Sequence, residues 1–132
     1  MDKILEAALD ELRDKTRYEH EAALFSRKVV GGKRVAAAFR MFAEEEAAHY
    51  EALKHFWPAL LESVEAPGPM DTSDSLRETL KRHIESEHGS IRIYEEILRG
   101  LELPAHKLVI KGILAEEKEH LKAAIQYLKH LE

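Results

Sequence analysis

The sequence contains no cysteine. Disulfide bonds, thiolate chemistry and cysteine-ligated metal sites are therefore excluded, and any metal ion would have to bind oxygen and nitrogen ligands. Long apolar runs are also missing. The longest, VAAAF at residues 35–39, is far shorter than the roughly 20 residues that a membrane-spanning helix needs. We therefore expect a soluble protein with no membrane partner.

An excess of positive charge is absent as well. The 132 residues include 20 Lys and Arg against 25 Asp and Glu, and the two signs are interspersed along the chain. This balance argues against nucleic acid as a partner. The N-terminal segment, MDKILEAALDELRDK, is charged throughout and lacks the apolar core and cleavage site of an export signal, so we expect a cytoplasmic protein.

Glycine and proline are few, and turn residues cluster at only three places, residues 30–34, 65–75 and 99–106. No segment alternates apolar and polar residues with the period of a strand. We therefore predict an all-α fold, a ferritin-like four-helix bundle made of two helical hairpins joined by a crossover loop. The predicted helices span residues 3–30, 34–62, 74–99 and 104–131. The chain length suits one domain, residues 1–132, with hairpins at 3–62 and 74–131 and a linker at 63–73.

Each predicted helix has an apolar stripe that is interrupted once near its middle by ionisable residues. In the second helix, Glu46 and His49 fill the gap between Phe42 and Leu53. In the fourth, Glu117 and His120 occupy the corresponding gap. The third helix has Glu87 at the centre of its stripe.

For the first helix we predict a buried stripe through Leu5, Leu9 and Leu12 that continues to Glu19, with Glu21 on the opposite side. Glu19 would then be the inward acid of this helix.

The interruptions repeat between the two halves of the chain. AEEEAAHYEAL at residues 43–53 aligns with AEEKEHLKAAI at 115–125, so that the Glu-x-x-His of the second helix recurs in the fourth. Glu19 and Glu87 are 68 residues apart, nearly the same as the 71 residues between Glu46 and Glu117. Each hairpin would thus supply one Glu from its first helix and a Glu-x-x-His from its second. The predicted metal ligands are Glu19, Glu46, His49, Glu87, Glu117 and His120.

Four carboxylates and two imidazoles can hold two divalent ions. Residues i and i+3 of a helix share a face, so a Glu-x-x-His directs both side chains to one point. Hard oxygen donors with one imidazole per ion suit iron or manganese better than a metal that prefers soft ligands. A metal-free bundle is the competing interpretation, because about one Glu-x-x-His is expected by composition and a third copy, Glu85 to His88, is present. Burying so many unpaired charges would be costly, which favours the metal site.

Two other residues lie on the buried side near the predicted site. His83, one turn before Glu87, is either a packing residue that supports a ligand or a ligand itself. Tyr94 is either a core tyrosine with a satisfied hydroxyl or a hydrogen-bonding partner of the metal centre, and we take it as a catalytic candidate of the second kind.

This pattern resembles the ferritin-like di-iron carboxylate proteins, in particular the rubrerythrin group. IESEHGSIRIYEEI at residues 84–97 is similar to the third helix of that family, and YEHEAALFS at 18–26 matches its first more loosely. The resemblance covers nearly the whole chain. It implies that the six residues named above are iron ligands and that the di-iron centre reacts with peroxide or dioxygen.

Three departures from the family are present. The cysteine-ligated rubredoxin domain is missing, so an external electron donor is expected. Ser90 stands where the family usually has a further Glu, and Ser26 stands where a family tyrosine would follow Glu19.

Two alternative functions are open. One is iron oxidation and storage, and the other is a binding module whose metal only stabilises the bundle. We expect a homo-oligomer, in the simplest case a dimer.

Overall fold

The computed structural model describes residues 2–28, 32–65, 67–68 and 72–131, and this part of the chain is helical with no strand. The all-α class is therefore confirmed. None of the described helices is both long enough and apolar enough to cross a lipid bilayer. The helices are α1 (Asp2–Lys28), α2 (Gly32–Phe56), α3 (Pro58–Leu61), α4 (Leu76–Gly100) and α5 (Pro104–Leu131).

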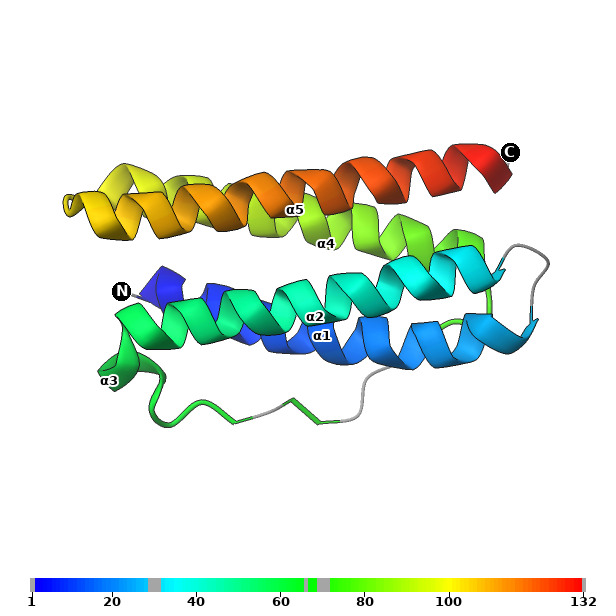
Figure 1. Cartoon of the computed structure of the whole chain (residues 1–132), viewed down its shortest axis with the longest axis horizontal. Coiled ribbons are helices and arrows are strands. Elements are labelled where there is room, and N and C mark those ends of the chain that lie inside the picture. Colours follow the sequence, from blue (N-terminus) through cyan, green and yellow to red (C-terminus); the bar gives the residue numbers. More distant parts are fainter. Residues whose placement is uncertain (1, 29–31, 66, 69–71, 132) are drawn as a thin grey trace.

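The four long helices lie side by side as two antiparallel pairs (Figure 1). α1 packs mainly on α2, and α4 packs mainly on α5, while the contacts between the two pairs are sparser. α3 ends at the opposite end of the molecule from the start of α4, so the connection between the pairs spans the length of the helices (Figure 1). As a result α2 and α4 run in the same direction.

The helix ends follow the local sequence, with one difference from the prediction. We predicted that the second helix continues to residue 62, but α2 ends at Phe56 and the short α3 begins at Pro58. Proline has no N–H to donate to the preceding turn, and it is well tolerated at the first position of a new helix. At the start of α4, the Ser75 hydroxyl accepts the Glu78 N–H at 3.2 Å. The predicted end of the first helix, at residue 30, lies outside the described residues.

The buried apolar residues form two separate clusters, one toward each end of the helices. The first contains Leu53, Tyr94 and Ile110, together with residues from the beginning of α1. The second contains Phe25, Phe39 and residues from the beginning of α4. The interior between them is filled by ionisable side chains.

The predicted buried face of α1 is wrong. Ile4, Glu11, Tyr18 and Phe25, which recur at the heptad spacing, are all buried. Glu19 lies outside this line. The prediction followed the large leucines of α1, but three of the buried positions on this helix are acidic, so hydrophobicity alone placed the inner face incorrectly.

Candidate metal centre

Six buried side chains from all four long helices meet between the two apolar clusters. Five of them are the ligands predicted on α2, α4 and α5, and the sixth is an acid of α1 that the sequence did not predict. The six residues are Glu11, Glu46, His49, Glu87, Glu117 and His120.

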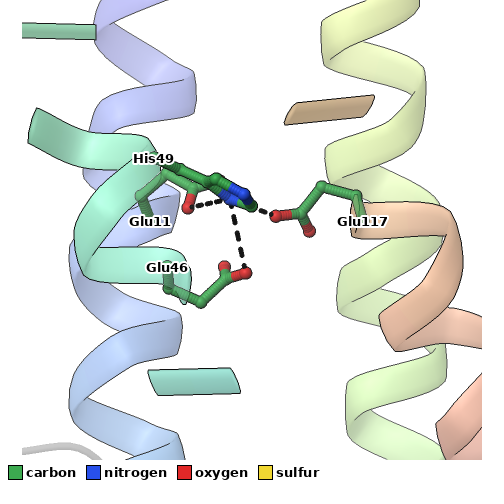
Figure 2. Close-up of side chains that lie close together, drawn as sticks. All are labelled: Glu11, Glu46, His49 and Glu117. Atoms are coloured by element: carbon green, nitrogen blue, oxygen red, sulfur yellow. Dashed lines mark hydrogen bonds and ion pairs between the residues drawn. The ribbon is translucent and has the colours of Figure 1, made fainter. Parts of the chain in front are cut away.

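The first group of potential ligands surrounds the ring of His49 (Figure 2). Its Nδ1 lies 2.9 Å from Glu117 Oε1, 3.1 Å from Glu11 Oε2 and 3.7 Å from Glu46 Oε1. Glu117 reaches this point from α5, across the space between the two helix pairs (Figure 2). One atom from each of the four residues lies within 4.8 Å of the others.

The second group surrounds the ring of His120 in the same way. Its Nδ1 lies 3.0 Å from Glu46 Oε1 and 3.8 Å from Glu87 Oε1. Together with Glu117, these residues also offer four ligand atoms within 4.8 Å of one another. Glu46 and Glu117 belong to both groups. This arrangement fits two neighbouring ions that share two carboxylates, with one further carboxylate and one imidazole for each ion.

Glu19 is not part of either group. Its side chain is 53% exposed and its Oε1 lies 3.2 Å from Lys15 Nζ on the same helix. The prediction that Glu19 faces the interior is therefore wrong, and Glu11 occupies the place assigned to it. Glu21, predicted to face solvent, is fully buried instead.

The correct pairing of α1 with α4 aligns Glu11 with Glu87 and Tyr18 with Tyr94. This register differs from the one that relates α2 to α5, which concealed it. A motif of Glu followed by Tyr two helical turns later is thus present in both halves. This motif could have identified Glu11 from the sequence.

The two tyrosines link the halves by reciprocal hydrogen bonds. Tyr18 Oη donates to Glu87 Oε1 at 3.0 Å, and Tyr94 Oη donates to Glu11 Oε1 at 2.9 Å. Burial, followed by the charge of the neighbouring acids, raises the pKa of both phenols well above their usual range. Both therefore remain protonated donors at neutral pH, and each fixes one carboxylate of the opposite helix pair.

Two partly exposed acids contact the Nε2 atoms of the two imidazoles. His49 Nε2 lies 3.3 Å from Glu116 Oε1, and His120 Nε2 lies 2.7 Å from Glu45 Oε2. Each acid comes from the opposite helix pair, and each directly precedes the inward Glu of its own Glu-x-x-His motif. An acceptor on Nε2 fixes the tautomer that leaves Nδ1 free to coordinate an ion. Neither acid was predicted from the sequence, although the two repeat in the same register as the two motifs.

Several atoms of the cluster are buried without a hydrogen-bond partner among the described residues. They are the Oε2 atoms of Glu46, Glu87 and Glu117, whereas Oε1 of Glu46 and of Glu117 faces an imidazole Nδ1. A buried carboxylate with no partner is strongly destabilised, and it must take up either a proton or a cation. These unpartnered atoms all lie inside the two four-residue groups, so the cluster has the donors and the need for metal ions.

In the absence of metal, the pKa values of the four acids show which of them bind protons instead of a cation. Burial raises the pKa of Glu11, Glu46 and Glu87 well above the usual range. Burial would also raise the pKa of Glu117, but its contacts with Glu87, His49 and Glu46 outweigh this effect and lower it to about 2. Metal binding should therefore displace protons from several acids.

The pKa values of the two imidazoles are also raised, because contacts with acids outweigh the effect of burial. Burial lowers the pKa of His120, but its interactions with Glu46, Glu117 and Glu45 outweigh burial and raise the pKa to about 9. The pKa of His49 is also raised, because Glu117 and Glu116 outweigh its burial. Without metal the His120 ring therefore carries a proton at neutral pH, and an ion bound at its Nδ1 would have to replace that proton.

Comparison with known proteins adds no assignment to this geometry. The sequence matches no protein-family model and no curated protein.

Replacing Glu11 or Glu19 of α1 by glutamine, in separate variants, tests which of these acids binds metal. We expect Glu11→Gln to lower the affinity for divalent ions at least tenfold, because it removes a charged ligand of the His49 group. Glu19→Gln, on the exposed face, should leave affinity and stability within about 0.5 kcal/mol of wild type. The measurement is calorimetric titration with Mn²⁺. Equal affinities for the two variants would show that Glu11 holds no ion.

A further buried acid, Asp14, lies one turn after Glu11, at the position that corresponds to Ser90 in the second half. Its Oδ1 accepts the Ser86 hydroxyl from α4 at 3.1 Å. Burial, and then the charge of Glu117, raises its pKa from 3.8 to about 7. Since the folded protein holds this proton more tightly than the unfolded chain does, the free energy of unfolding should fall as the pH rises from about 4 to about 7.

We therefore expect Asp14→Asn to stabilise the metal-free protein by a few kcal/mol at pH 8, at roughly 1.4 kcal/mol for each pH unit of the raised pKa. The gain should shrink to less than about 1 kcal/mol near pH 4, where Asp14 is protonated in the folded state and partly protonated in the unfolded chain. Urea unfolding in the presence of chelator at the two pH values checks this, with the exposed Glu51→Gln as control. A gain that is the same at both pH values would contradict the expected titration of Asp14.

Proposed function

We propose that this chain is a ferritin-like, rubrerythrin-like di-iron protein, an oxidoreductase that reacts with peroxide or dioxygen. The observation that carries the proposal is the pair of overlapping four-residue groups, joined by Glu46 and Glu117 and completed by one imidazole each. A purely structural ion would need only one such group. Two groups with shared carboxylates suit a pair of ions that act together.

The donor set supports iron as the metal. Four carboxylates can neutralise the charge of two divalent ions, and the nitrogen donors of the two groups are the two imidazoles. Hard oxygen donors with a single imidazole per ion favour iron or manganese over metals that prefer sulfur. When bound, two ferrous ions would together supply two electrons to an oxidant.

The corrected first helix strengthens the family resemblance. The Ser26 departure arose only because Glu19 was taken as the ligand. With Glu11 in that role, Tyr18 follows at the same spacing as Tyr94 follows Glu87. The crossing connection between α3 and α4 supports the same ferritin-like topology.

In this proposal the protein residues supply ligands, orientation and protons. Glu45 and Glu116 fix the imidazole rings, while Tyr18 and Tyr94 hold protons at the carboxylates of Glu87 and Glu11. A phenol whose pKa is raised keeps its proton until the charge on its carboxylate partner changes. Tyr94, our predicted catalytic candidate, thus shares this role with Tyr18. The electron donor is external, because the chain has no cysteine for a relay of its own.

The test is the reaction of anaerobic ferrous protein with each oxidant. We expect stoichiometric peroxide to oxidise the bound iron within seconds and to produce near-ultraviolet absorption of ferric protein, with turnover only when an electron donor is added. Glu46→Ala, which removes a shared ligand, should abolish the fast phase, and Glu44→Ala, at an exposed position of the same helix, should retain it.

Ferrous protein that binds two irons but is inert to both peroxide and dioxygen would contradict the oxidoreductase proposal. That result would assign the metal a structural role. Early elution of the protein in gel filtration, as a closed shell, would instead favour iron storage.

A further inference from the structure

A second buried ionisable pair lies outside the metal cluster. Glu21 of α1 and His83 of α4 are both completely buried, and His83 Nε2 contacts Glu21 Oε1 closely. The pair sits one helical turn from Tyr18 on α1 and one turn from Glu87 on α4. Neither residue belongs to the two groups that could hold metal ions.

The imidazole of His83 is stacked on the ring of Tyr18. The two ring centroids are 4.0 Å apart and the planes are nearly parallel, at 6°. Phe39 packs against both rings, with centroids 5.0 Å from Tyr18 and 5.3 Å from His83. The position of the Tyr18 phenol, which donates to Glu87, is therefore defined by a ring that Glu21 in turn anchors.

The other half of the molecule lacks this pair. In the register that aligns Tyr18 with Tyr94, His83 corresponds to Ala7 and Glu21 corresponds to Ile97, and both of these apolar residues are buried in the first apolar cluster. Tyr94 thus has apolar side chains at the places where Tyr18 has an imidazole and a carboxylate. The apolar solution is compatible with the fold, and a buried charged or polar pair is often less stable than apolar residues of similar volume. The pair consequently calls for an explanation other than stability.

We propose that Glu21 and His83 are positioning residues that hold Tyr18 on Glu87 and thereby make the two metal positions unequal. The inference rests on the proposed di-iron function. An anchored phenol holds the Glu87 carboxylate in one orientation, so the ion bound by Glu87 and His120 meets a pre-arranged ligand. The ion bound by Glu11 and His49 depends on Tyr94, which has the apolar Ala7 and Ile97 at the corresponding places.

Loss of a residue that orients a metal ligand typically lowers metal affinity about 10–100-fold. We therefore expect two separable steps when metal-free protein is titrated with Co²⁺ and followed by its visible absorption. His83→Ala should weaken one step by about tenfold or more and leave the other within about twofold. Glu21→Gln, which keeps an acceptor for the His83 N–H, should retain both steps.

Two further variants separate positioning from general destabilisation. Ile97→Ala makes a cavity beside Tyr94 without removing a hydrogen bond, so it should lower the melting temperature but keep both binding steps. Glu21→Leu with His83→Phe removes the polar pair while roughly preserving volume, so that no unpaired buried charge is left. This double variant should fold, and it should still bind Co²⁺ more weakly than wild type in one of the two steps.

A measurement on metal-free protein makes the test independent of the proposed function. In proton NMR spectra the Tyr18 and Tyr94 hydroxyl protons should both exchange slowly in the wild type, since both phenols are buried donors. In the Glu21→Leu, His83→Phe variant the Tyr18 hydroxyl proton should exchange several-fold faster, at a rate close to that of Tyr94, while the Tyr94 rate stays unchanged. If both exchange rates and both metal steps are unchanged there, the positioning role is refuted. If wild-type protein binds no metal, the di-iron proposal fails, while the hydroxyl signals still decide whether the pair positions Tyr18.

Discussion

The burial of four carboxylates at the centre of an otherwise apolar bundle is the constraint on which the rest of the structure depends. Each would be strongly destabilised alone, and the Oε2 atoms of Glu46, Glu87 and Glu117 have no hydrogen-bond partner among the described side chains. The apolar core is accordingly divided into two clusters, one on each side of the acids. These clusters stabilise the helices, and the space between them keeps the acids away from water. The fold is thus arranged to create a need for positive charge at one place, which protons or metal ions can meet.

The two helix pairs are related by approximate two-fold symmetry, and each contributes equivalent residues to the buried cluster. Hydrogen bonds from Tyr18 and Tyr94 cross from one helix pair to the other, as do the contacts of Glu45 and Glu116 with the imidazoles. The helix pairs make fewer close backbone contacts with each other than within each pair, so they are joined by side chains, those of the ionisable cluster and those of the two apolar clusters. The symmetry is broken at two places near the centre, by Asp14 opposite Ser90 and by the Glu21 and His83 pair opposite apolar residues. Differences between the two groups of potential ligands would arise there.

The sequence predicted the helical class and five of the six clustered residues, and the reasons for success and failure are physical. On α2 the large side chains of Phe42 and Leu53 flank the acids, so the apolar pattern identified the buried face correctly. On α1 three of the buried positions are acids and the leucines are only partly buried, although Tyr18 and Phe25 share the buried face. A pattern search that weights size and hydrophobicity therefore selected Glu19. The two helices of each hairpin repeat in different registers, which reinforced this error, and partners such as Glu116 could not be inferred without the distance across the bundle.

Metal stoichiometry is the most direct test of the claim that the central acids require cations. Protein purified without chelator should contain two metal ions per chain, and anaerobic titration of the metal-free protein with Fe²⁺ should show an end point at two equivalents. Removal of the ions should lower the melting temperature, because ions that bind only the folded state stabilise it. A chain that binds no ion saturably, and melts at the same temperature with and without chelator, would contradict the account.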